Sequence, residues 1–196
     1  MIAVSINSPS SQAAKATSDA AIPRWYVMRD LLPRNASNSA YKVLGNMGIK
    51  FFTPMHWEIV NSGNNRKTRR YLPIIHDLLF IYDTREVIDS LVASVKKLQY
   101  RYQCGGRPHT PIVIGNEEMQ SFINAVNNDP TPIYFTPEEL TPAMIGREAE
   151  VNGGPMNGCR GRLLKMQGSK KRRIIMEIPG LLAAAVEVNP DYLKLL

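Results

Sequence analysis

This sequence contains two runs of basic residues, and their side chains are the ones best suited to bind another molecule. The candidate nucleic-acid-binding residues are Arg66, Lys67, Arg69 and Arg70 in the first run, and Lys170, Lys171, Arg172 and Arg173 in the second. Guanidinium and ammonium groups at this density can neutralise several phosphates of a nucleic acid. Each run can also be a solvated loop without a function, and for the second run we slightly favour the loop.

Catalytic chemistry finds little support. His56, His76 and His109 lie in unrelated contexts without the spacing of metal ligands. Cys104 and Cys159 form no C-x-x-C pair, so neither a disulfide framework nor a zinc site is indicated. The sequence has no Gly-x-Ser-x-Gly motif and no phosphate-binding loop. We therefore expect no enzyme, no catalytic residue, no metal and no cofactor.

The composition indicates a folded, basic protein. Hydrophobic residues make up 44% and charged residues 21% of the 196 residues, which is too apolar for a disordered chain. The net charge of +7 and the pI near 9.5 suit a negatively charged partner, most commonly nucleic acid. Apolar runs such as 181–186 are far shorter than the roughly 20 residues that cross a bilayer. The start of the chain lacks a secretory signal, so we expect a cytoplasmic protein without a membrane partner.

The elements that must position the candidate side chains follow from periodicity and turn residues. Residues 1–22 are small, polar and aperiodic, and predict a flexible tail. A first domain over 23–128 is predicted, in which Ser37 or Asn38 caps the first helix and Asn116 caps the last. Its predicted strands are 24–29, 50–60, 69–75, 78–82, 98–102 and 112–114, of which 50–60 and 69–75 form a hairpin, and its helices are 41–47, 85–95 and one that begins at 116.

The second half of the chain has a different character. Four prolines, at positions 130, 132, 137 and 142, predict a linker over 129–144, because proline cannot continue a helix or a central strand. Beyond it no helical period is present, and short strands alternate with Gly, Pro and Asn turns. The predicted strands are 148–151, 161–167, 173–178 and 183–188. Short strands of this kind predict a small β-barrel over 145–196.

The turn at 151–163 carries the most specific motif. Its sequence Val-Asn-Gly-Gly-Pro-Met-Asn-Gly-Cys-Arg-Gly-Arg-Leu resembles a KOW motif, in which an apolar strand enters a glycine-rich turn. The turn residues are Gly153, Gly154, Gly158 and Gly161. The resemblance implies a five-stranded SH3-like barrel. Any β-hairpin with glycines is the alternative, because a short glycine-rich turn is a modest signal.

The order of parts resembles the NusG family. Trp25-Tyr26-Val27 opens a β-α-β unit well before the KOW-like segment. The run Gly105-Gly106-Arg107-Pro108, followed by Glu117-Glu118-Met119 and Phe122-Ile123, resembles a run of that family's N-terminal domain. The resemblance implies an α+β fold, with an N-terminal NusG-type α/β sandwich of antiparallel sheet and helices plus a C-terminal SH3-like KOW β-barrel. Length and tail look closest to the specialised RfaH and UpxY paralogues.

The resemblance also implies a polymerase-binding surface. The residues it carries over are Trp25, Tyr26, Arg29, Ile75, His76, Leu78, Phe80, Asp89 and Ser90. Two positions depart from the family pattern: Arg29 replaces an aromatic residue, and His76-Asp77-Leu78 replaces a Pro-Gly-Tyr run. Core packing is the alternative role for the apolar members, and a solvated helix turn is the alternative for Asp89 and Ser90.

The implied function is that of a monomeric transcription elongation and antitermination factor. It would bind the clamp helices of RNA polymerase and suppress pausing or termination on a dedicated surface-polysaccharide operon. Non-template DNA or nascent RNA are further partners left open, as are the ribosome or a termination factor through the KOW domain. A ribosome-associated or RNA-binding KOW protein and a general NusG factor are the alternatives. A barrel that stays β is mildly preferred over one that refolds into helices.

Overall fold

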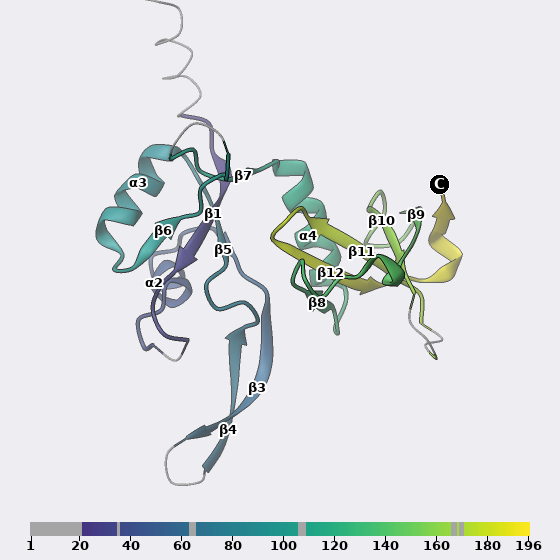
Figure 1. Cartoon of the computed structure of the whole chain (residues 1–196), viewed down its shortest axis with the longest axis horizontal. Helices are drawn as coiled ribbons and strands as arrows, with labels where there is room; N and C mark the ends of the chain where they lie inside the picture. The colour runs from purple at the N-terminus through teal and green to yellow at the C-terminus, as the bar shows by residue number, and fades with distance from the viewer. Residues whose placement is uncertain (1–20, 35, 63–65, 106–108, 166–167, 169–170) are drawn as a thin grey trace, which may run out of the picture. The chain divides into compact units, whose positions relative to one another are not determined.

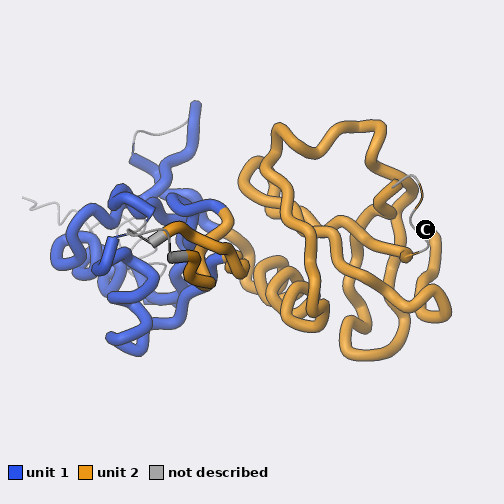
Figure 2. Tube along the Cα trace, turned by 90° about the horizontal axis from the view of Figure 1, so that it is seen from below, with its two compact units in different colours: residues 1–53, 75–113 blue, residues 54–74, 114–196 orange. Residues whose placement is uncertain are grey.

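The computed structural model describes residues 21–34, 36–62, 66–105, 109–165, 168 and 171–196. The predicted tail 1–22 lies almost wholly outside these residues, as do Gly106, Arg107 and Lys170. The described chain is a mixed α/β protein with three α-helices and three sheets (Figure 1). It divides into two compact units, unit 1 over 1–53 and 75–113 and unit 2 over 54–74 and 114–196 (Figure 2).

The sheet of unit 1 is built around its first strand. The strands run in the order β2-β5-β1-β6, and β7 also pairs with β1. Their bounds are β1 Arg24–Asp30, β2 Phe51–Phe52, β5 Leu79–Asp83, β6 Leu98–Tyr100 and β7 Val113–Ile114. Tyr26 lies opposite Ile81 in the antiparallel β1–β5 pair. The strands predicted at 24–29, 78–82, 98–102 and 112–114 are confirmed. The strand predicted at 50–60 is divided instead, because β2 pairs with β5 in this sheet and the chain resumes as a separate strand at Met55.

One face of this sheet forms a hydrophobic core with helices α2 (Ala40–Asn46) and α3 (Arg85–Ser94). Successive strand residues point to opposite faces, so Tyr26 and Met28 enter this core while Trp25 and Val27 point to the other side. Ile88 and Leu91 are the buried residues of α3, and their spacing places both on one face of the helix.

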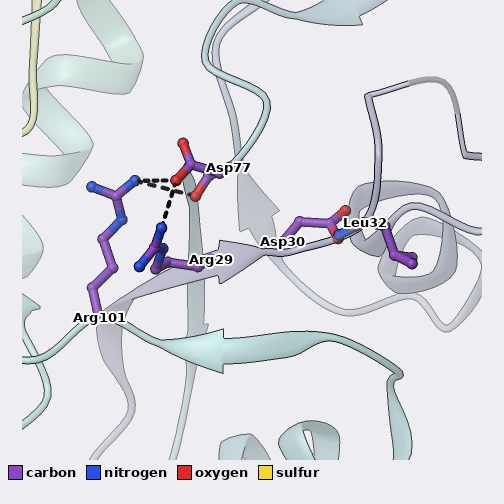
Figure 3. Close-up of polar contacts among 5 residues, drawn as sticks. All are labelled: Arg29, Asp30, Leu32, Asp77 and Arg101. Atoms are coloured by element: carbon purple, nitrogen blue, oxygen red, sulfur yellow. Dashed lines mark hydrogen bonds and ion pairs between the residues drawn. The ribbon is translucent and has the colours of Figure 1, made fainter.

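The first turn of α2 is capped by a residue that the sequence did not indicate. Neither Ser37 nor Asn38 is the N-cap; the position is Ser39, whose side chain makes no capping hydrogen bond. The Ala40 amide instead donates to Asp30 Oδ2 at 2.6 Å. The Leu32 amide donates to Asp30 Oδ1 at 3.0 Å (Figure 3). The end of β1 thus places a buried carboxylate at the first amide of α2, and the same carboxylate also accepts from an amide of the loop that follows β1.

The predicted hairpin is confirmed as strands β3 (Met55–Ser62) and β4 (Arg66–Pro73). These two strands pair only with each other among the described strands. Trp57 lies opposite Tyr71, and Ile59 lies opposite Arg69. Residues directly opposite in an antiparallel pair share a face, so these four side chains project from one side of the ribbon.

The sheet of unit 2 has the strand order β13-β9-β10-β11-β12-β8. Its strands are β8 Ile133–Phe135, β9 Ile145–Val151, β10 Arg160–Leu164, β11 Arg173–Ile178, β12 Leu182–Glu187 and β13 Leu193–Leu195, and two 3₁₀ turns, η1 Pro142–Met144 and η2 Pro190–Tyr192, join them. The four strands predicted from the sequence are confirmed as β9 to β12. Closure into an SH3-like barrel stays a prediction.

Helix α4 (Asn116–Asn128) belongs to unit 2, although the sequence suggested a first domain that ends near Asn128. It contacts β11 and β12. Asn124 Nδ2 donates to the Pro155 carbonyl at 3.0 Å, and the Glu187 amide donates to Asp129 Oδ2 at 2.7 Å, just beyond the helix. Its N-cap is Gly115 rather than the predicted Asn116.

The predicted linker 129–144 is not a plain connection. Strand β8 lies within it and pairs with β12, with Ala184 opposite Tyr134. The prolines do not prevent this because β8 is the edge strand of the sheet and contains no proline itself. No helix in the described part of the chain is long and apolar enough to cross a membrane.

Candidate functional site

Arg29, Asp77 and Arg101 form a charged cluster in unit 1, which we call the Asp77 cluster (Figure 3). Asp77 Oδ2 accepts from Arg101 Nη2 at 3.0 Å and from Arg29 Nη2 at 3.4 Å. Arg29 projects from β1, Arg101 follows β6, and Asp77 precedes β5. These strands are neighbours in the order β5-β1-β6, so the sheet itself brings the three side chains together.

The Asp77 cluster has more positive than negative charge. Two guanidinium groups share one carboxylate, which leaves a formal excess of one positive charge. The Arg29 side chain is 47% exposed, whereas those of Asp77 and Arg101 are 24% and 26% exposed. Exposed ion pairs of this kind contribute little to stability. Arg29 can therefore leave its ion pair with Asp77 at little cost and bind a negatively charged group of a partner.

The cluster joins the two positions at which the chain departs from the family pattern. Arg29 takes the place of an aromatic residue, and Asp77 belongs to the His76-Asp77-Leu78 run. The structure pairs Arg29 with Asp77 and leaves His76 exposed and Ile75 half-buried. The surface that includes Arg29 and His76 is therefore charged and polar.

The apolar members of the predicted polymerase site are buried. Trp25, Tyr26, Leu78 and Phe80 are each 5% exposed or less. Trp25 packs on Tyr82, with ring centroids 5.2 Å apart. These side chains therefore pack in the core, which was the alternative to a polymerase-binding role. Their contact with a polymerase stays a prediction.

Asp89 and Ser90, on helix α3, are exposed but have partners within unit 1. Asp89 Oδ1 accepts from Arg85 Nε at 2.9 Å and from the Tyr100 hydroxyl at 2.8 Å, and Ser90 Oγ donates to the Glu86 carbonyl at 3.0 Å. Burial, together with this bond to Asp89, raises the pKa of Tyr100 well above its usual range. Asp89 therefore ties α3 to β6.

The first basic run lies on a strand, not in the turn of the hairpin. Lys67, Arg69 and Arg70 are exposed residues of β4, and Arg66 begins this strand. Alternation sends Lys67 and Arg69 to one face and Arg70 to the other. The Arg69 guanidinium lies 4.8 Å from the centre of the Trp57 ring.

The second basic run is partly neutralised. Lys171 Nζ lies 2.6 Å from Glu187 Oε2, and Arg173 Nη2 lies 3.7 Å from the same oxygen. Arg173 is a buried residue of β11, opposite Glu187 in β12. Arg172 is exposed, and Lys170 lies outside the described residues. This run is a weaker candidate than the hairpin for binding phosphates.

The glycine turn between β9 and β10 has the backbone that its sequence predicts. Gly153, Gly154 and Gly158 have φ values of 127°, 65° and 82°, which favour glycine. Gly161 has a different role, since a Cβ atom there would meet the Ile175 carbonyl oxygen of β11 at 2.4 Å. It permits close approach of β10 to β11.

Sequence reasoning missed three residues that these surfaces depend on. Arg101 was not singled out, because an isolated arginine after a strand gives no signal. Trp57 and Tyr71 stand out only once the hairpin register places them opposite each other with large exposed areas. The Trp57-x-Ile59 alternation next to a basic strand is the one sequence signal that could have indicated them. No group of three or more His, Cys, Asp or Glu side chains in the described residues could hold a metal ion.

Comparisons with known proteins find similarity to solved structures but not to sequence families. No family model matches the sequence, and no curated protein matches it. Among solved structures, the chain is similar to one titled "Domain interaction in Thermotoga maritima NusG", with 16% sequence identity and a TM-score of 0.44. The match covers 89% of this chain and 98% of that one.

Proposed function

We propose that this protein is a transcription elongation and antitermination factor of the NusG type. It binds RNA polymerase through unit 1 and suppresses pausing or termination. We further propose that it acts on a dedicated operon, such as one for surface polysaccharides, as the specialised paralogues do.

The observation that carries the proposal is the glycine turn of 153–158. Its three positive φ values give the KOW-like sequence the backbone that its glycines require, between two antiparallel strands. A generic hairpin needs at most one or two such residues in its turn. The antiparallel sheet opened by Trp25-Tyr26-Val27, with helices on its face, supports the same assignment.

The mechanism requires binding and no chemistry. A factor that prefers the closed clamp of the polymerase shifts the clamp toward that state by the difference between its affinities for the closed and open states. The Asp77 cluster suits an acidic or polar surface on the partner better than an apolar helix, because its excess charge is on the half-exposed Arg29. The basic face of the hairpin would add contacts to nucleic acid near the bound polymerase.

The test is a pull-down of purified core RNA polymerase with the tagged full chain, followed by single-round transcription. The full chain is used because a fragment that ends at Asn128 would separate α4 from the strands it contacts. Arg29→Glu should reduce polymerase binding, whereas Arg147→Glu, an exposed charge reversal in β9, should leave it unchanged.

A folded full chain that does not bind polymerase would contradict the proposal. Salt-sensitive copurification with ribosomal particles in place of polymerase would favour the ribosome-associated alternative.

A further inference from the structure

The two arginines of the Asp77 cluster are held unequally (Figure 3). Arg101 Nη2 donates to Asp77 Oδ2 at 3.0 Å and to the Asp77 carbonyl oxygen at 3.3 Å. Arg29 reaches the same Oδ2 through one nitrogen at 3.4 Å, and its side chain is the more exposed of the two. Arginine binds a carboxylate most strongly through two parallel hydrogen bonds, and Arg29 makes only one. Arg29 is therefore the weakly held member of the cluster.

Release of Arg29 would not leave the Asp77 carboxylate without a cation. Arg101 stays in contact with it, and Arg101 has little freedom to move because its Nε atom is buried. In the described part of the chain, neither arginine is paired with another carboxylate. The shared carboxylate thus allows Arg29 to exchange its partner while the rest of the cluster stays in place.

The neighbour of Arg29 on the sheet is neutral and can donate a hydrogen bond. Gln99 is exposed and lies directly opposite Arg29 in the antiparallel β1–β6 pair. Residues in this relation share a face, with Cβ atoms about 4.5–5.5 Å apart. The Gln99 amide and the Arg29 guanidinium can therefore donate to the same incoming carboxylate.

We propose that Asp77 is an internal competitor, which holds Arg29 until a carboxylate of a protein partner replaces it. Arg29 and Gln99 then donate to an Asp or Glu side chain of the partner, while Arg101 keeps Asp77. The inference rests on the proposed function in taking RNA polymerase as the partner, but carboxylate binding can be measured without polymerase.

The charge of the site favours a single carboxylate over a nucleic acid. The Asp77 cluster has one formal excess positive charge, and the Asp77 carboxylate remains beside the ligand after the exchange. Nucleic acids are bound by several cations at once, because their phosphates are closely spaced. The retained carboxylate repels such a polyanion, and this repulsion contributes to specificity.

Two substitutions that conserve side-chain shape should change polymerase binding in opposite directions. Asp77→Asn removes the competitor, so the affinity should rise about 2- to 5-fold. Gln99→Glu adds a competitor opposite Arg29, so the affinity should fall by a similar factor. The double variant should return toward the wild-type affinity. Asp191→Asn, which changes net charge as Asp77→Asn does but lies at an exposed position in unit 2, should leave the affinity unchanged.

The rise in affinity separates competition from a structural role. If Asp77 only supported the fold, its replacement would weaken polymerase binding or leave it unchanged. Arg29→Lys should also weaken binding, because lysine keeps the charge but lacks the planar fork that holds a carboxylate. Circular dichroism and the melting temperature establish that each variant is folded.

Arginine side-chain NMR signals provide a readout that does not need polymerase. The isotope-labelled full chain is titrated with hexaglutamate, with hexaglutamine and with a single-stranded DNA hexamer. The Nε–Hε signal that is absent from Arg29→Lys identifies Arg29. We expect hexaglutamate to shift this signal, hexaglutamine to leave it in place, and Asp77→Asn to bind hexaglutamate more tightly than the wild type.

The inference would be overturned by an unchanged or lower polymerase affinity of folded Asp77→Asn, and the proposed function would survive that result. An Arg29 signal that responds to the DNA hexamer and not to hexaglutamate would overturn it too. If hexaglutamate binds at Arg29 as expected and the wild-type chain does not bind polymerase, the carboxylate site is supported and the proposed function fails.

Discussion

Arg29 and Asp77, 48 residues apart in sequence, are joined by an ion pair of 3.4 Å on the surface of unit 1. Asp77 is also shared with Arg101, so the three side chains leave one formal positive charge on this surface. The half-exposed Arg29 is the member of the Asp77 cluster that a partner can reach most easily.

The first prediction concerns the unequal contributions of this pair. Arg29→Ala should lower the free energy of unfolding by less than about 1 kcal/mol, since its side chain is half exposed. Asp77→Ala should cost more, about 1–2 kcal/mol, because it also leaves the less exposed Arg101 without its carboxylate. Urea unfolding of both variants and of the double variant measures this, and equal costs would contradict the shared-carboxylate geometry.

The second prediction separates two uses of glycine. Gly161→Ala should destabilise the protein more than Gly158→Ala, although only Gly158 has a positive φ. A Cβ at position 161 would lie 2.4 Å from a backbone oxygen of β11, whereas nothing lies within 4 Å of one at position 158. The strain at 158 alone should cost roughly 1–3 kcal/mol. Thermal unfolding compares the variants, and the reverse order would refute the close approach of β10 and β11.

The third prediction is a loss of stability at alkaline pH. The pKa of Tyr100 is raised in the folded state by burial and by its bond to Asp89, so the folded protein holds this proton more tightly than the unfolded chain. Its contribution is complete below the unfolded pKa of about 10 and is lost as pH rises above it. Wild type should exceed Tyr100→Phe in stability by about 0.5–1.5 kcal/mol at neutral pH.

That difference should shrink above pH 10 in urea unfolding measured across the pH range. Parallel curves for wild type and Tyr100→Phe would show that the hydroxyl does not titrate differently in the two states. The variant keeps the Arg85–Asp89 ion pair, so a general loss of α3 is not expected.

The fourth prediction is that α4 stabilises the C-terminal strands. A fragment of residues 114–196 should unfold at a higher temperature than one of residues 129–196, because α4 contacts β11 and β12. Phe122→Ala in the longer fragment should remove much of this gain, since Phe122 is 1% exposed and truncation of such a side chain costs about 3–5 kcal/mol. Equal melting temperatures for the two fragments would count against the grouping of α4 with unit 2.

Local patterns predicted the elements well. The helix predicted at 85–95, the hairpin predicted from 50–60 and 69–75 and the glycine turn all depend on residues within a few positions of one another. Each is present in the structure, with the hairpin strands at Met55–Ser62 and Arg66–Pro73. Strands β8 and β13 were not predicted. Each has three residues and pairs at an edge of the sheet, and so short a segment has no period of its own.

Contacts between residues far apart in the sequence could not be predicted from local patterns. Asp30 caps a helix ten residues further on because strand β1 ends beside the first turn of α2. The sequence of the hairpin does not show which aromatic and basic residues share a face, because that depends on the pairing of its two strands. Helix α4 has an apolar stripe that could cover either sheet, and only the packing assigns it to β11 and β12.

The sequence by itself determined most of the helices and strands, the turn that needs positive φ, and the absence of catalytic motifs, because these follow from short-range sterics and side-chain chemistry. Only the tertiary structure decided that Arg29 meets Asp77, that Trp25 is buried while Trp57 is exposed, and where the two units divide. Those outcomes depend on which strands become neighbours. The neighbours are set by the burial of apolar surface over the whole chain and not by any single segment.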